Sequence, residues 1–153
     1  MRLSLQVQYA VCGVFDLAYN GQGEPVQIRV ISERQGIPAR YLEQIFQRLR
    51  RARLVQSKRG PGGGYTLARR PAEITLRDVV EAVEGPLDGR GARRRRLGGD
   101  KQSATSFRPS FLWPMLSESI ADVLARTNLE AMCRDAQRSS VRRAHPDVHM
   151  YFI

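Results

Sequence analysis

The chain has 153 residues, of which 42% are hydrophobic, so it can form one domain with a buried core and a helical appendage. Lys and Arg number 25 against 15 Asp and Glu, a net charge of +10. This excess suggests a polyanionic partner, although charge alone equally allows a merely soluble basic protein. Residues 1–70 hold 12 of the cations and 4 of the anions, so we expect the polyanion-binding surface mainly in the first half. No apolar run is long enough to cross a membrane.

The first predicted element is a helix over residues 4–20. Its apolar side chains recur at steps of three and four residues, which places them on one helical face. Ser4 should cap the start of this helix, and the pair Asn20 and Gly21 should end it.

Two further helices are predicted over residues 28–35 and 38–53, joined through a tight turn at Gly36. Pro38 suits the first helical position because its missing N–H would be unpaired there anyway. The second of these helices is rich in Arg and Gln outside its apolar stripe. Two helices in this order match a helix-turn-helix, although plain helical bundles contain the same pattern. The apolar stripe consists of Leu42, Ile45, Phe46 and Leu49.

A hairpin follows, with strands predicted over residues 54–58 and 65–68 and a glycine-rich turn over residues 60–64. A hairpin directly after a helix of the recognition type is typical of a wing. The glycine run does not indicate a phosphate-binding loop, because no Lys-Ser or Lys-Thr pair follows it and no helix begins there.

The next helix is predicted over residues 75–84, with Thr75 as its cap and Asp78 near its positive end. The periodic pattern then breaks down. Residues 85–109 include four consecutive arginines at 93–96, so we expect a basic loop without regular structure there.

A long helix is predicted over residues 111–126, and its apolar residues form one continuous stripe. Thr127 is expected to cap a last helix that runs through Cys133. The pattern weakens beyond Arg138, so residues 139–153 are expected to be a weakly ordered tail.

Five stretches carry a resemblance to a known family: Met1-Arg2-Leu3-Ser4, Tyr9-Ala10-Val11, Ile31-Ser32-Glu33-Arg34-Gln35-Gly36-Ile37, Tyr41-Leu42-Glu43-Gln44-Ile45-Phe46, and Arg59-Gly60-Pro61-Gly62-Gly63-Gly64-Tyr65. With the order of the elements, they resemble the Rrf-two family of bacterial winged helix-turn-helix transcription regulators, of the IscR, NsrR and CymR type. The resemblance covers the first 85 residues almost continuously, and it resumes at Leu112 and Trp113 and around residues 127–129.

The resemblance implies a mainly α winged helix-turn-helix fold with a two-stranded wing and a long C-terminal dimerisation helix. It also implies a homodimer that places one recognition helix per subunit in the major groove of a roughly palindromic double-stranded DNA site. The expected units are residues 1–85 for DNA binding, 86–110 for a basic loop, 111–138 for dimerisation and 139–153 for the tail. The dimerisation residues would be Leu112, Trp113, Leu116, Ile120, Val123 and Leu124.

Position and chemistry assign DNA contacts to exposed residues of the third helix and the wing. Glu43 can accept a hydrogen bond from cytosine N4, and Gln44 can pair with adenine. Arg59, at the wing tip, should enter the minor groove, where a narrow groove concentrates negative potential. The alternative for each residue is a solvated surface group. The predicted base-reading residues are Arg40, Glu43, Gln44 and Arg59, and the predicted phosphate contacts are Arg48, Arg51 and Lys58.

Sensor members of this family hold a 2Fe-2S or 4Fe-4S cluster on three cysteines of the loop before the long helix. Residues 85–109 contain no cysteine, so ligation by three loop cysteines is impossible and no cofactor is predicted. Cys12 and Cys133 lie far apart on predicted helices and should be small buried residues.

Two hypotheses explain the missing ligands. In the first, the chain is a clusterless member that senses a small molecule or a partner protein. In the second, residues 89–109 are translated out of frame, because the resemblance is lost abruptly there and recovers at Leu112. Resequencing the gene decides between them.

The leading function is sequence-specific regulation of transcription, and the alternative is a protein-interaction module that has lost regulated DNA binding. An enzyme is not expected, because no nucleophile–base pair or carboxylate pair stands out. No metal site is expected at His145 and His149, since Pro146 interrupts the helix that would align them. No signal-peptide pattern precedes the first helix, so we expect a cytoplasmic protein.

A smaller departure from the family is Arg53, where glycine usually ends the recognition helix. If the backbone is left-handed at this position, Arg53 carries a strain of about 1 kcal/mol.

Overall fold

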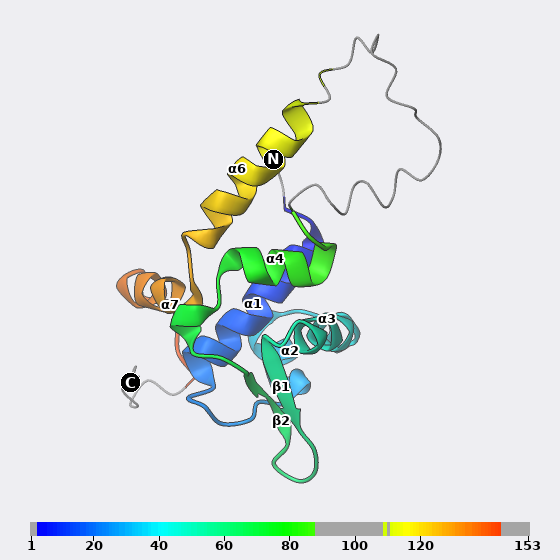
Figure 1. Ribbon diagram of the computed structural model, residues 1–153. Helices are drawn as coiled ribbons and strands as arrows, with labels where there is room; N and C mark the ends of the chain where they lie inside the picture. Colours follow the sequence, from blue (N-terminus) through cyan, green and yellow to red (C-terminus); the bar gives the residue numbers. More distant parts are fainter. Residues whose placement is uncertain (1–2, 88–108, 110, 145–153) are drawn as a thin grey trace.

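The computed structural model describes residues 3–87, 109 and 111–144. It has the expected mainly helical fold with a two-stranded antiparallel sheet (Figure 1). At the centre lies α1 (Leu5–Asn20), which packs against α2 (Ile28–Gln35), α3 (Ala39–Arg51), α4 (Leu76–Glu84) and α7 (Leu129–Arg138). Within the described part of the chain, no helix is both long enough and apolar enough to span a membrane.

The central helix begins as predicted, because the Ser4 side chain accepts a hydrogen bond from the Val7 N–H at 3.2 Å. Its close contact with α3 depends on Gly13. A Cβ atom at Gly13 would lie 2.7 Å from Cε2 of Phe46, so a larger residue would require the buried Phe46 ring or α3 to move. The α1 side of the core consists mainly of Val7, Ala10, Val14, Leu17 and Ala18.

The helix-turn-helix consists of α2 and α3. Gly36 ends α2 in a left-handed conformation, with φ +64°, and its N–H donates to the Ser32 carbonyl. The predicted start of α3 is wrong by one residue, because Pro38 has ψ +130° and is therefore the cap instead of the first helical residue. The predicted end is late by two residues: α3 ends at Arg51, and Arg53 has φ +57°.

The wing consists of β1 (Val55–Lys58) and β2 (Gly64–Leu67), which pair in an antiparallel register within one residue of the predicted strands. A further bridge ties the wing to the segment before α2. Here the Val26 N–H donates to the Tyr65 carbonyl at 2.9 Å, and the Tyr65 N–H donates to the Val26 carbonyl at 2.8 Å. Tyr65 of β2 is therefore paired on both sides, with β1 and with Val26.

The predicted cap of α4 is confirmed. The Asp78 N–H donates to Oγ1 of Thr75 at 3.2 Å, and the Thr75 N–H donates to Oδ2 of Asp78 at 2.9 Å. The short 3₁₀ helix η1 (Pro71–Glu73) lies between β2 and this cap.

The predicted cap of α7 is wrong. Asn128, and not Thr127, caps this helix, because its Oδ1 accepts from the Ala131 N–H at 2.8 Å. The Thr127 carbonyl instead accepts from the Leu76 N–H at 2.9 Å. This bond places the start of α7 beside the start of α4.

The long helix α6 (Leu112–Ala125) rises away from the rest of the chain and contacts α4 near its base (Figure 1). After α7 the chain returns to α1, where the Tyr19 hydroxyl donates to the Val141 carbonyl at 3.0 Å and the Ala144 N–H donates to Oδ1 of Asn20 at 3.0 Å. Most of the predicted basic loop, residues 88–108 and 110, lies outside the described residues, as do residues 145–153 of the predicted tail.

Candidate nucleic-acid interface

The recognition helix α3 buries one side and exposes the other. Its apolar stripe is buried as predicted, at Leu42, Ile45, Phe46 and Leu49. The three base-reading candidates on this helix, Arg40, Glu43 and Gln44, are all exposed and lie in its first two turns. The part of α3 that would enter a DNA groove first therefore presents a cation, a carboxylate and an amide.

Arg40 is held against the next residue of the helix. Its Nη2 donates to the Tyr41 hydroxyl at 3.1 Å, and its guanidinium carbon lies 4.8 Å from the centroid of the Tyr41 ring. The Tyr41 ring in turn lies 6.2 Å from the ring of Tyr9 in α1, centroid to centroid. Tyr41 therefore holds the guanidinium at the start of α3 and is itself backed by Tyr9. Sequence analysis did not single out Tyr41 as a residue of this surface.

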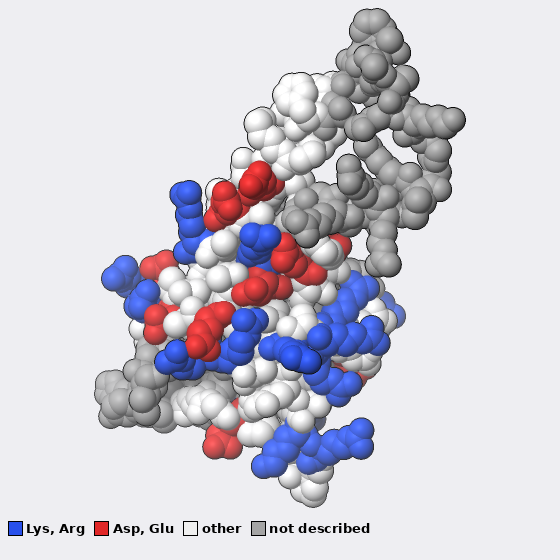
Figure 2. All heavy atoms as spheres, in the orientation of Figure 1, with Lys and Arg blue, Asp and Glu red and all other residues white. Residues whose placement is uncertain are grey.

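The wing adds further cations to the same region. Lys58 ends β1, and Arg59 follows it at the start of the turn; both are exposed. In this turn Gly60 and Gly62 have φ +93° and +71°, which a side chain would disfavour. Cations gather over α3 and around the wing, whereas most of the acidic side chains of this face lie over α4, the lower part of α6 and α7 (Figure 2). The surface formed by α3 and the wing is thus suited to a polyanion.

Two further cations of α3, Arg48 and Arg50, form hydrogen bonds to other elements of the chain. Arg50, which sequence analysis did not single out, donates from Nη1 to Oγ of Ser57 at 3.2 Å and so links α3 to β1. Arg48 is half-buried, and its Nη1 donates to Oε1 of Gln6 at 2.9 Å and to the Val83 carbonyl at 3.0 Å. Arg51, by contrast, is exposed at the end of α3.

A buried carboxylate ties α1 to α2. Asp16 is fully buried, and it accepts hydrogen bonds from Nδ2 of Asn20 at 3.0 Å, Nη1 of Arg34 at 3.1 Å and Nε2 of Gln35 at 2.9 Å. These bonds hold the last turn of α2, which precedes the turn into the recognition helix. Sequence analysis missed this cluster because its members lie up to 19 residues apart.

The apolar stripe predicted for dimerisation lies on α6. Trp113, Leu116 and Val123 are 55%, 41% and 63% exposed, whereas Leu112 and Ile120 are half-buried. Leu124 packs against the main core. In the single chain, the stripe therefore leaves a large apolar surface uncovered along α6.

The chain has two cysteines, Cys12 in α1 and Cys133 in α7, which is fewer than the four thiolates of a typical iron–sulfur cluster. Burial raises the pKa of the Cys133 thiol to about 11 and also raises the pKa of Cys12 above its usual range. Both thiols therefore favour the protonated form at neutral pH. Among the described residues, no group of three His, Cys, Asp or Glu side chains is arranged to hold a metal ion.

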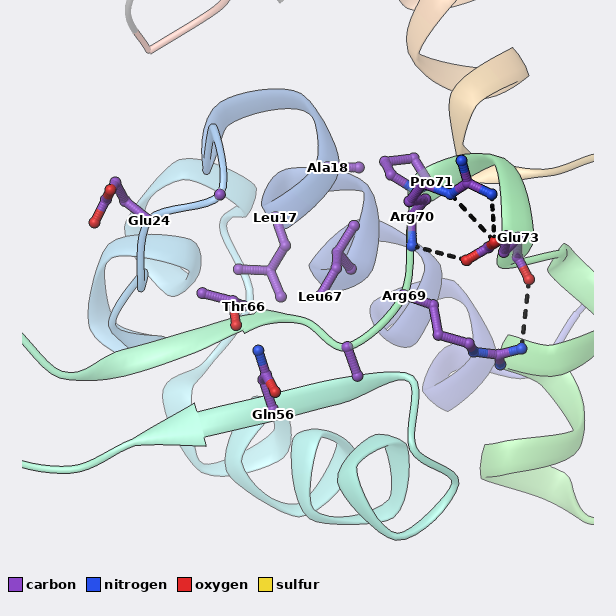
Figure 3. A pocket seen from close by; sticks show the side chains of 12 residues that line it. Leu17, Ala18, Glu24, Gln56, Thr66, Leu67, Arg69, Arg70, Pro71 and Glu73 are labelled. Carbon is purple, nitrogen blue, oxygen red and sulfur yellow. Dashed lines mark hydrogen bonds and ion pairs between the residues drawn. The ribbon is translucent and has the colours of Figure 1, made fainter. Parts of the chain in front are cut away.

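A surface pocket of about 510 Å³ lies between the end of α1, the wing and η1 (Figure 3). The two cations that line the pocket both contact Glu73. Arg70 forms an ion pair with the Glu73 carboxylate at 2.7 Å, and Nη1 of Arg69 donates to the Glu73 backbone carbonyl at 3.5 Å. These contacts brace the segment between the wing and α4.

Comparison with known proteins agrees with this arrangement. A family model described as "Iron-dependent Transcriptional regulator", Rrf2, matches residues 3–135. The chain is 40% identical over 139 residues to the HTH-type transcriptional regulator IscR of Photorhabdus laumondii, covering 90% of this chain and 82% of that protein. It is similar to the structure of T. potens IscR, with a TM-score of 0.70 and 36% identity over 93% of each chain. It is also similar to CymR, the global cysteine regulator of B. subtilis, with a TM-score of 0.67 and 28% identity over 88% of this chain and 98% of that chain.

Proposed function

Because the chain belongs to the Rrf2 family of transcriptional regulators, we propose that it regulates transcription by binding a roughly palindromic DNA operator as a homodimer. The family is one of regulators and not of enzymes. The observation that carries the proposal is the exposed start of α3, with Arg40, Glu43 and Gln44, followed directly by a wing that presents Lys58 and Arg59. We place this action in the cytoplasm, where the operator would lie.

Each base-reading residue has a chemical preference. In the major groove, the Arg40 guanidinium suits guanine O6 and N7, the Gln44 amide suits adenine, and the Glu43 carboxylate suits the N4 amino group of cytosine. Arg59, at the wing turn, is suited to a narrow minor groove. Arg51 and Lys58 would contact phosphates, which raises affinity without discriminating between sequences.

The test begins with selection of an operator from a random duplex library by the wild-type protein. We expect a roughly palindromic sequence that binds more tightly than random DNA, with an affinity that falls steeply as salt increases. Arg59→Ala should weaken operator binding by about tenfold, and Glu43→Ala should relax the base preference at one position of each half-site by a similar factor. Fluorescence anisotropy with the selected operator and with a random duplex measures the affinity of each variant.

The control is Arg134→Ala, which removes a cation of α7 that forms only an exposed pair with Glu130. It should leave operator affinity unchanged. If no sequence is enriched and the chain binds all duplexes equally, the proposed function is wrong and a protein-interaction module becomes the better hypothesis.

We also propose that the chain acts without an iron–sulfur cluster of its own and responds to a small molecule or a partner protein. The support is the sequence of residues 85–109, which lacks cysteine. Anaerobically purified protein should be colourless, and a visible absorption spectrum with cluster bands would contradict this part of the proposal.

A further inference from the structure

The half-buried guanidinium of Arg48 in α3 connects three helices. Nη1 of Arg48 carries two N–H groups, and both have acceptors: Oε1 of Gln6 in the first turn of α1 at 2.9 Å, and the Val83 carbonyl in α4 at 3.0 Å. These partners lie 42 and 35 residues away in sequence. Arg48 therefore bridges elements that meet only through folding.

The acceptor in α4 is well suited to a cation. Val83 lies in the last turn of α4, where the carbonyls have no further helical N–H to bind and the helix dipole is negative. A charge-assisted bond to such a carbonyl is stronger than a neutral one, because the guanidinium carries a full charge. Val83 itself is buried, so the bond lies at the edge of the core and is partly shielded from water.

The segment beyond Val83 is also held in place. Gly85 leaves α4 with φ +94°, and the Leu87 N–H then donates to Oε1 of Glu81 at 3.2 Å. The same oxygen of Glu81 accepts from Nε of Arg77 at 3.1 Å. The last turn of α4 is thus a fixed support against which Arg48 can hold α3, and α4 also packs against α6.

We propose that Arg48 is a positioning residue for DNA recognition, which sets the pose of α3 on α4 and α1, and not a contact to DNA phosphate. This inference rests on the proposed function. Its consequence is that the orientation of the base-reading face depends on the last turn of α4, and through α4 on the placement of α6. A change at the α6 interface would therefore alter operator recognition without touching DNA.

The test compares Arg48→Met with Arg51→Met on a selected operator and on a random duplex of equal length, over a range of salt concentrations. Methionine keeps the aliphatic stem of arginine and removes the donors. For Arg51→Met, a phosphate contact predicts equal losses on both duplexes and a salt slope lower by about 0.9. For Arg48→Met, a positioning role predicts an unchanged slope and a loss of at least about tenfold in the preference for operator, comparable to one mismatched base pair.

A second variant removes the bridge from the other side. Gln6→Ala leaves the Arg48 charge in place and takes away one acceptor, so it should lower operator preference in the same direction as Arg48→Met. Amide hydrogen exchange at Glu84, Gly85 and Leu87 should be faster in Arg48→Met, which loses the bond to the Val83 carbonyl.

Two results would overturn the proposal: a slope reduction in Arg48→Met like that of Arg51→Met, or an unchanged operator preference in both Arg48→Met and Gln6→Ala. If wild-type protein selects no operator, the proposed function has failed instead, and the exchange measurement still tests the bridge itself.

Discussion

Arg53 holds a backbone conformation that normally belongs to glycine. Its φ is +57°, its N–H donates to the Arg50 carbonyl at 3.0 Å, and the Leu54 N–H donates to the Leu49 carbonyl at 3.0 Å. This pair of bonds is a Schellman motif, with Arg53 at the left-handed position. We expect Arg53→Gly to stabilise the protein by about 1 kcal/mol, because glycine has no Cβ to clash there. Denaturant unfolding measures the change.

Arg53→Ala is the matched control, because alanine keeps the Cβ and should bring no comparable gain. Gln47→Gly, in the exposed middle of α3, should destabilise by about 1 kcal/mol. If Arg53→Gly and Arg53→Ala unfold at the same denaturant concentration, the strain assigned to Arg53 is absent.

Contacts between residues within one helical turn could be predicted from the sequence. The caps at Ser4 and Thr75 were predictable because each accepts a bond from an N–H three residues ahead. Thr127 and Asn128 are both capable caps, and the choice between them depends on a bond from Leu76, 51 positions earlier in the numbering. For the same reason the partners of Arg48 could not be foreseen, since folding brings them together.

At the level of elements, the contact between α1 and α2 depends on the buried Asp16. Its carboxylate receives side-chain donors from Asn20, Arg34 and Gln35, and the Arg34 side chain is 25% exposed. Asp16→Ala should destabilise the protein by about 3 kcal/mol, since it leaves several donors without an acceptor in a partly buried site. Chemical denaturation measures this loss, and hydrogen exchange should place the faster amides in α2.

The comparison for Asp16→Ala is Arg134→Gln, which breaks the surface pair of Arg134 with Glu130 on α7. That pair joins side chains four residues apart in α7 that are 53% and 24% exposed, so its loss should cost about 0.5 kcal/mol or less. Equal effects of the two variants would contradict the special role of Asp16.

The elements themselves followed from periodicity and turn chemistry, because these are local properties. Their bounds shifted where the backbone departs from helical geometry, as at Pro38 and Arg53. The face that α3 buries was also predictable from the sequence. For α6 the sequence predicted the helix and its apolar stripe. It could not separate stripe residues that pack within the chain, such as Leu124, from those that remain exposed, such as Val123.

At the scale of the whole molecule, α6 leaves an apolar surface that a second copy of the chain would cover. Trp113, Leu116 and Val123 are all more than one-third exposed, although α6 is tied to the rest of the molecule through α4. An exposed stripe of this kind marks an interaction site. We expect Val123→Glu to weaken dimerisation by at least about tenfold, because pairing would bury a carboxylate. Analytical ultracentrifugation measures the dissociation constant.

Val123 is the best position for this test because its side chain is 63% exposed, so the substitution should not disturb folding of the single chain. Glu118→Ala alters the opposite face of α6 and should leave dimerisation unchanged. Val123→Glu should weaken binding to the full operator more than binding to a single half-site, since the proposed dimer would engage two half-sites at once. A Val123→Glu protein that remains dimeric and binds the operator normally would mean that the dimer forms through another surface.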